Sequence, residues 1–252
     1  MTVEWLAVER RLGAVEVQLV TFPYAGGSAS VYRSWSEWLP PAVELCLALL
    51  PGRERRIGEP AFERIDALVA EFAGTLPATL DRPYVLFGHS MGATVAYELT
   101  REIERRGGRA PAGLIVSGQR APHCAEDSPR IHDLPDGEFV DAIRRLGGTP
   151  PEVFEHVDLV ELLLPLLRAD FSAVETHSWS PGPPLEIPIA VFTGESDDVV
   201  EAGDAAAWSE QTTAWSVVET FPGSHFFVLE RPEVVAQRAG AVALDFATRQ
   251  LA

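Results

Sequence analysis

The sequence contains no lysine, so all 20 of its basic side chains are arginines, and Asp and Glu outnumber them at 37. The formal net charge is −17 at pH 7. A surface of this charge repels phosphate groups, so we expect neither nucleic acid nor an anionic membrane as a partner. The missing lysine also excludes a P-loop, and the glycine pattern Gly-x-Gly-x-x-Gly of dinucleotide-binding folds is absent.

Cysteine and long apolar runs are scarce as well. The two cysteines, Cys46 and Cys124, are too few for a disulfide framework or a cysteine metal site, so we expect no metal. Cys46 lies in an apolar run and is expected to pack as a small apolar side chain. Residues 1–11 carry charges and no long apolar stretch, which predicts neither a signal peptide nor a membrane span and favours a cytoplasmic protein.

The remaining sequence is typical of an α/β protein. A chain of 252 residues with 46% hydrophobic content can bury one core, so we expect a single domain over 1–252. Strand-like and helix-like runs alternate, which predicts a mostly parallel central sheet flanked by helices. The strand runs are 15–21, 43–50, 84–87, 114–117, 187–193 and 215–221, and the helix runs are 31–39, 65–80, 94–106, 204–210 and 233–249.

One long insertion interrupts this alternation. The stretch between the strand runs 114–117 and 187–193 is far longer than an ordinary connection. It contains two helix-like runs, 136–146 and 158–175, and the second is apolar on nearly every side. Such a helix needs a core or an apolar ligand channel around it, so we predict a helical lid over about 125–180. The alternative is a helical subdomain that only covers the edges of the sheet.

Ser90 lies in the pentapeptide Gly88-His89-Ser90-Met91-Gly92, directly after the strand run 84–87 and before a helix run. A Gly-x-Ser-x-Gly sequence in this position resembles the nucleophile elbow of the α/β-hydrolase fold. The elbow places the serine hydroxyl at a helix N-terminus, where the helix dipole favours developing negative charge. The sequence therefore predicts Ser90 as a nucleophile, against the simpler interpretation of a turn that happens to contain a serine.

A serine nucleophile needs a base, and the base needs an acid that orients it. In this fold the acid and then the histidine follow the serine along the chain. His225 follows the last strand run and is the predicted base. Asp197 follows the run 187–193 and is the predicted acid, with the adjacent Asp198 as its rival. Asp197 and Asp198 could also both be solvated turn residues, since Asp is common in turns.

A third loop, 22–28, contains the paired glycines Gly26 and Gly27 after the first strand run. Paired glycines let backbone N–H groups turn toward a common point. We predict an oxyanion hole formed by the N–H groups of Ala25 and Met91, and each donor contributes roughly 3–4 kcal/mol in the transition state.

Several segments together resemble the type II thioesterases that accompany nonribosomal peptide and polyketide synthases, over about residues 17–235. The elbow is shared by all α/β-hydrolases, whereas the Pro-Gly-Arg-x-x-Arg and Leu-Pro-x-Leu-Arg-Ala-Asp-Phe segments are more restrictive. Many members have His where Tyr24 stands here, which leaves the backbone donor at Ala25 intact. The matching segments are 22–27, 50–56, 88–92, 164–171 and 222–227.

The resemblance implies an enzyme that hydrolyses stalled or incorrect acyl groups from the phosphopantetheine arm of carrier proteins. The arm belongs to the substrate, so no cofactor is expected, and we expect a monomer. Two alternatives stay open within enzymes, namely a chain-releasing thioesterase and a small-ester hydrolase. A third is a hydrolase-fold binding protein without activity.

Carrier proteins are usually acidic, so docking on this acidic chain requires a local positive patch. We predict Arg53, Arg55 and Arg56 for this role. Arg53 and Arg56 could instead pair with acids inside the fold. A second candidate group consists of Arg101, Arg105 and, past Gly107 and Gly108, Arg109; a solvated helix end explains this group equally well.

Overall fold

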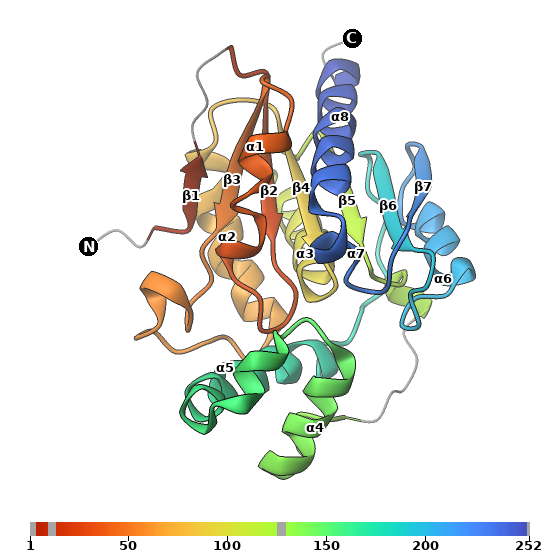
Figure 1. Ribbon diagram of the computed structural model, residues 1–252. Helices are drawn as coiled ribbons and strands as arrows, with labels where there is room; N and C mark the ends of the chain where they lie inside the picture. The colour runs from red at the N-terminus through yellow and green to blue at the C-terminus, as the bar shows by residue number, and fades with distance from the viewer. Residues whose placement is uncertain (1–3, 10–13, 125–129, 251–252) are drawn as a thin grey trace.

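The computed structural model describes residues 4–9, 14–124 and 130–250. Within these residues, seven strands form one sheet in the order β1-β3-β2-β4-β5-β6-β7 (Figure 1). Only β1 pairs antiparallel, with β3, and all other pairs are parallel. This confirms the predicted mostly parallel sheet. The strands are β1 (Leu6–Glu9), β2 (Val17–Phe22), β3 (Val43–Ala48), β4 (Tyr84–His89), β5 (Gly113–Ser117), β6 (Ile189–Gly194) and β7 (Ser216–Phe221).

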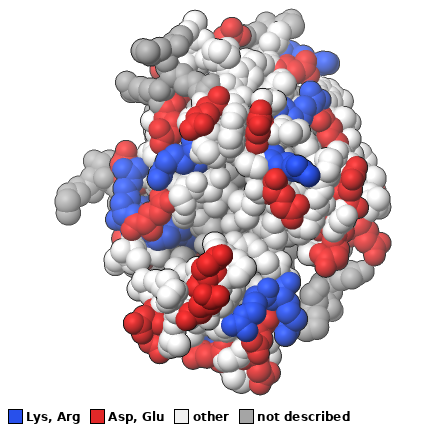
Figure 2. All heavy atoms as spheres, in the orientation of Figure 1, with Lys and Arg blue, Asp and Glu red and all other residues white. Residues whose placement is uncertain are grey.

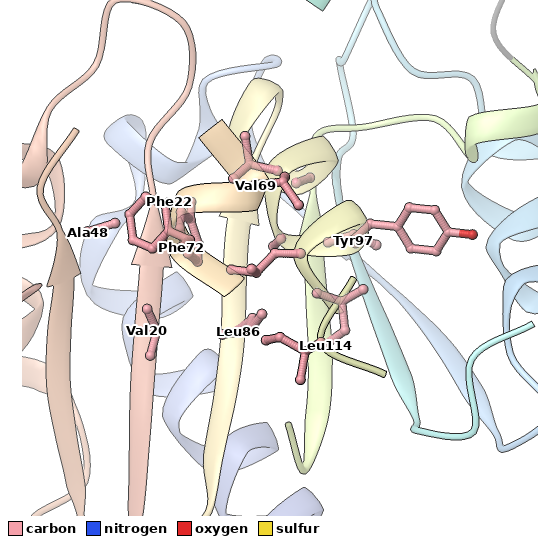
Figure 3. Close-up of a cluster of buried hydrophobic side chains, with 14 of the residues drawn as sticks. Val20, Phe22, Ala48, Val69, Phe72, Leu86, Tyr97 and Leu114 are labelled. Atoms are coloured by element: carbon pink, nitrogen blue, oxygen red, sulfur yellow. The ribbon is translucent and has the colours of Figure 1, made fainter. Parts of the chain in front are cut away.

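Helices cover both faces of the sheet, and this explains why the central strands are continuous apolar runs. Every residue of β2, β4, β5 and β6 is buried. Alternate side chains of a strand point to opposite faces, so Val20, Leu86 and Leu114 pack on one face with α2 (Ile65–Thr79) and α3 (Met91–Arg105) (Figure 3). Their neighbours Leu19, Phe87 and Ile115 pack on the other face with α1 (Trp35–Trp38) and α8 (Pro232–Gln250).

The insertion forms a separate helical layer. Helices α4 (Asp136–Leu146) and α5 (Val157–Glu175) flank the short 3₁₀ helix Pro151–Glu155 and lie beyond one end of the sheet in Figure 1. They share a small core of their own around Phe139, Ile143 and Leu167. The predicted lid spans about 125–180, and residues 125–129 lie outside the described residues.

Two predicted helices are shorter and less regular than expected. The run 31–39 consists of a 3₁₀ helix, Ala29–Tyr32, followed by α1. Tyr32 and Trp35 are fully buried with ring centroids 4.9 Å apart, so tertiary packing of these two rings, rather than helix propensity, determines the backbone there. The run 204–210 is likewise divided between α6 (Ala202–Ala206) and a 3₁₀ helix at Ala207–Gln211.

Candidate active site

Ser90 occupies a strained turn between β4 and α3. Its φ is 52° and its ψ is −118°, a conformation that L-amino acids rarely adopt. The flanking glycines make the turn possible, since a Cβ atom on Gly88 would lie 2.0 Å from the carbonyl oxygen of Gly92. A Cβ atom on Gly92 would lie 2.2 Å from the carbonyl oxygen of Phe22. A larger residue at position 88 or 92 would therefore collide with the backbone, and this is why glycine stands two residues before and two residues after Ser90.

The structure brings Asp197 and His225 together. Nδ1 of His225 lies 3.0 Å from Oδ2 and 3.1 Å from Oδ1 of Asp197. The Asp197 side chain is completely buried, and its Oδ1 also accepts hydrogen bonds from the backbone N–H groups of Val199 and Val200. Burial by itself raises the pKa of Asp197, but the hydrogen bond and charge of His225 and the two N–H donors outweigh it, so the pKa is lowered. The rival Asp198 is exposed.

Close contact between two loops allows this pairing. The backbone N–H of Ser196 donates to the carbonyl of Gly223 at 2.9 Å, and that of Glu195 donates to the carbonyl of Phe221 at 2.8 Å. A Cβ atom on Gly194 would lie 2.4 Å from the carbonyl oxygen of Ser224. Glycine at 194 thus permits the loop carrying the acid to approach the loop carrying the histidine.

His89 is buried behind the elbow and hydrogen bonds away from the serine. Its Nδ1 lies 2.9 Å from Oγ of Ser117, whose carbonyl in turn accepts the backbone N–H of Ser90 at 2.8 Å. The rings of His89 and His225 have centroids 5.2 Å apart, which places His225 beside the elbow. Burial, and then the charge of His225, hold the pKa of His89 well below its ordinary value. His89 is therefore a neutral supporting side chain.

Both backbone N–H groups predicted to form the oxyanion hole, those of Ala25 and Met91, lack a hydrogen-bond acceptor among the described residues. Met91 is the first residue of α3, where the backbone N–H has no partner within the helix. The loop turns at Gly26, whose φ is +79°, and the N–H of Gly27 donates to the carbonyl of Tyr24 at 2.9 Å.

The helical insertion contacts the loops of the predicted oxyanion donor and the predicted base through two aromatic residues, Tyr24 and Phe226, that the sequence did not single out for this purpose. The Tyr24 hydroxyl donates to the carbonyl of Gly148 at 3.0 Å, and the ring of Tyr24 packs edge-on against Phe226 at 5.1 Å. A Cβ atom on Gly148 would lie 2.4 Å from the Phe226 ring. The turn after α4 therefore lies directly on the neighbour of His225.

The arginines predicted for docking do not form one exposed group. Arg53 and Arg56 are each only 7% exposed. Arg53 pairs with Asp170, and Arg56 pairs with Glu59 and donates to the carbonyl of Leu49. These contacts favour the structural alternative for both. Among the three, only the Arg55 side chain is largely exposed, at 52%.

The second arginine group is also largely engaged. Arg101 pairs with Glu98 at 3.1 Å, and Arg109 donates to the carbonyls of Leu80 and Arg82. Arg105 is exposed but pairs with Glu102. Arg101 and Arg105 line a surface cavity of about 650 Å³ between α2 and α3, and none of the predicted catalytic residues lines it.

A family model described as "Thioesterase domain" matches residues 17–242. The chain belongs to this family. Among curated proteins, "Thioesterase PikA5" of Streptomyces venezuelae is 38% identical and covers 84% of this chain and 75% of its own length. "Linear gramicidin dehydrogenase LgrE" of Brevibacillus parabrevis is 37% identical, with coverage of 91% and 88%. Among solved structures, the type II thioesterase BorB from the borrelidin biosynthetic cluster matches with a TM-score of 0.85 and 36% identity, covering 96% of this chain and 97% of that one.

These similarities confirm the type II thioesterase resemblance, the α/β-hydrolase fold and the enzyme class, a thioester hydrolase. The word dehydrogenase belongs to the name of that relative alone. Nowhere in the described ranges is there a helix long and apolar enough to cross a membrane, and no group of three or more His, Cys, Asp or Glu there could hold a metal ion.

Proposed function

We propose that this thioesterase hydrolyses acyl thioesters on the phosphopantetheine arm of carrier proteins, and so removes aberrant acyl groups from a polyketide or nonribosomal peptide synthase. The observation that carries the proposal is the buried Asp197–His225 pair beside the strained elbow of Ser90. Family membership and relatives from such pathways support the choice of thioester substrates. The triad and the acyl-enzyme are inferred from the geometry.

In the first half-reaction His225 acts as the base. Its Nδ1–H donates to Asp197, which leaves Nε2 free to accept the proton of the Ser90 hydroxyl. The Ser90 oxygen attacks the thioester carbonyl carbon, and the carbonyl electron pair moves to its oxygen. The N–H groups of Ala25 and Met91 donate to this oxyanion. The carbon–sulfur bond then breaks, His225 returns the proton to the departing sulfur, and the acyl group remains on Ser90.

In the second half-reaction water takes the place of the serine. His225 removes a proton from the water, whose oxygen attacks the acyl carbon. The ester bond to Ser90 breaks, and His225 returns the proton to the serine oxygen. The free acid leaves, and the Ser90 hydroxyl is restored. A thiolate is a better leaving group than an alkoxide or an amine, so the first step requires little assistance at the departing atom.

The lid and the charge distribution fit a carrier-bound substrate. Helices α4 and α5 and their apolar core lie over the loops that carry the catalytic residues. Figure 2 shows this side of the molecule with uncharged atoms in the middle of the face, above the lid, and charged side chains largely around them. A thin arm that carries a small acyl group needs only a narrow channel beneath an apolar lid. Arg55, whose side chain is 52% exposed, stays a docking prediction for the acidic carrier.

The test is a hydrolysis panel. Acetyl, propionyl, long-chain, aminoacyl and peptidyl groups are offered on a carrier protein and on N-acetylcysteamine, and the acetyl and peptidyl groups also as oxygen esters. The product released is measured for the wild type and for Ser90→Ala. The proposal expects higher kcat/KM on the carrier and no turnover by Ser90→Ala. Cyclised or intact peptide products would indicate a chain-releasing enzyme, and a preference for oxygen esters would indicate an esterase; either result would overturn the editing function.

A further inference from the structure

The lid helix α5 holds the predicted oxyanion loop through one buried carboxylate. Asp170, on α5, is 3% exposed, and its Oδ2 accepts the backbone N–H of Gly26 at 2.7 Å. Arg53 donates to both carboxylate oxygens, at 3.0 Å and 2.8 Å, and to the carbonyl of Gly27 at 2.7 Å. The pair therefore binds the loop at two successive residues, once through an N–H group and once through a carbonyl.

Packing reinforces these hydrogen bonds. A Cβ atom on Gly26 would lie 2.5 Å from Cδ2 of Leu167, so α5 lies against the backbone of the loop with no room for a side chain. The N–H of Gly27 donates to the carbonyl of Tyr24 and closes the turn. Ala25 stands between residues that are fixed on both sides, and its own N–H is left without a partner among the described residues.

We propose that Asp170, with Arg53 as its partner, is a positioning residue that holds the Ala25 N–H where the oxyanion forms, so that the lid helix contributes to the chemical step. The inference rests on the proposed function, in which Ala25 supplies one of the two oxyanion donors. A preorganised donor stabilises the transition state and not the bound substrate, and removing one donor typically lowers kcat by about 10²–10³-fold. A displaced loop should therefore affect kcat and leave KM nearly unchanged.

A purely structural role predicts a different result. Breaking a buried ion pair leaves an unpaired charge and destabilises the fold, which lowers the melting temperature and the amount of active protein. It does not lower the affinity for a transition-state analogue relative to the affinity for the product. The two roles are therefore separated by comparing the binding of an alkylboronic acid, which forms a tetrahedral adduct with a serine hydroxyl, with the binding of the carboxylate product.

The experiment uses Asp170→Asn and the double variant Arg53→Gln/Asp170→Asn, which leaves no unpaired charge. Acetyl-N-acetylcysteamine hydrolysis, the Ki of butylboronic acid and the Ki of butyrate are measured on folded enzyme quantified by Ser90 labelling. The expected result is a 10- to 100-fold lower kcat with KM within about twofold, a matching rise in the boronic acid Ki, and an unchanged butyrate Ki. The control is Arg168→Gln, because Arg168 also lies on α5 but, among the described residues, its hydrogen bonds stay within the lid, to Asp136 and the carbonyl of His132.

Wild-type kcat in Asp170→Asn, or equal weakening of boronic acid and butyrate, would overturn the inference. If neither Asp170 variant folds, Arg53→Lys decides by the same three measurements, since lysine keeps the charge but cannot reproduce the forked contact with both carboxylate oxygens. The proposed function fails separately, if the wild type hydrolyses no thioester or if Ser90→Ala retains turnover.

Discussion

Both carboxylate oxygens of Asp197 lie within 3.1 Å of Nδ1 of His225, while the adjacent Asp198 is exposed. Asp197→Asn should therefore lower kcat/KM by about 10³–10⁴-fold, because an amide no longer holds the imidazole in the tautomer that leaves Nε2 free. Asp198→Asn is the matched control and should stay within about twofold of the wild type. Acetyl-N-acetylcysteamine hydrolysis measures both, and the reverse ranking would overturn the assignment of the acid.

Ser90→Ala should abolish turnover, with a loss on the order of 10⁶-fold in kcat, the size typical when a triad nucleophile is removed. The fold should persist, since alanine is smaller than serine and the strained backbone is set by the neighbouring glycines. A fluorophosphonate probe should label the wild type once and leave Ser90→Ala unlabelled. Labelling at another serine, with activity retained, would contradict the elbow as the nucleophile site.

Arg55→Glu should weaken carrier binding. The Arg55 side chain is 52% exposed, and its Nη1 lies 3.2 Å from Oε2 of the exposed Glu4. Reversing the charge of Arg55 therefore disturbs little inside the fold. We expect KM for an acetylated carrier protein to rise about 5- to 10-fold, as for a charge at the rim of an interface, with acetyl-N-acetylcysteamine unaffected. The control is Arg249→Glu, another exposed and ion-paired arginine, at the C-terminal end of α8. Equal losses on both substrates would indicate a fold defect instead of docking.

His89 should make the stability depend on pH. Its pKa is lowered in the folded state, so below the unfolded value of about 6.5 the unfolded chain binds the proton more readily. Stability therefore falls as the pH falls below that value, by up to about 1.4 kcal/mol per pH unit from this residue. His89→Gln should remove this contribution.

Urea unfolding of wild type and His89→Gln at pH 5.0, 5.5, 6.0 and 8.0 measures the effect. The difference in unfolding free energy between the two proteins should shift in favour of the variant as the pH falls from 6.0 to 5.0. At pH 8.0 the histidine is neutral in both states, so the difference measured there is the reference value without any contribution from protonation of His89. If the unfolding free energies of the two proteins instead change in parallel with pH over the whole range, His89 binds a proton as readily in the folded protein as in the unfolded chain, and the expectation is wrong.

The sequence was most informative where local constraints are strict. A Cβ atom on either glycine beside Ser90 would lie about 2 Å from neighbouring backbone, so the spacing of the two glycines is a reliable signal of the turn. The central strands were recognised because helices bury both faces, which makes the strands continuously apolar. Strand β1 was missed because four residues with mixed burial carry too weak a pattern.

The roles of the arginines could not be predicted in the same way. An arginine in a Pro-Gly-Arg segment looks the same whether it faces a partner or the interior. Its burial depends on Asp170, which is 117 residues away in the chain. The contact of Tyr24 with Gly148 spans 124 residues and was missed for the same reason. Such pairings are set by tertiary structure, and neither periodicity nor composition reports them.

The position of Phe226 has a consequence for engineering. Phe226 directly follows His225, and its ring lies under the turn at Gly148 and against Tyr24. A chimera that takes its α4–α5 segment from a relative, in order to accept a longer acyl chain, would bring a foreign turn onto this ring. The graft should therefore be made together with the residues at 24 and 226, so that the donor's three contacting positions are transferred as one module.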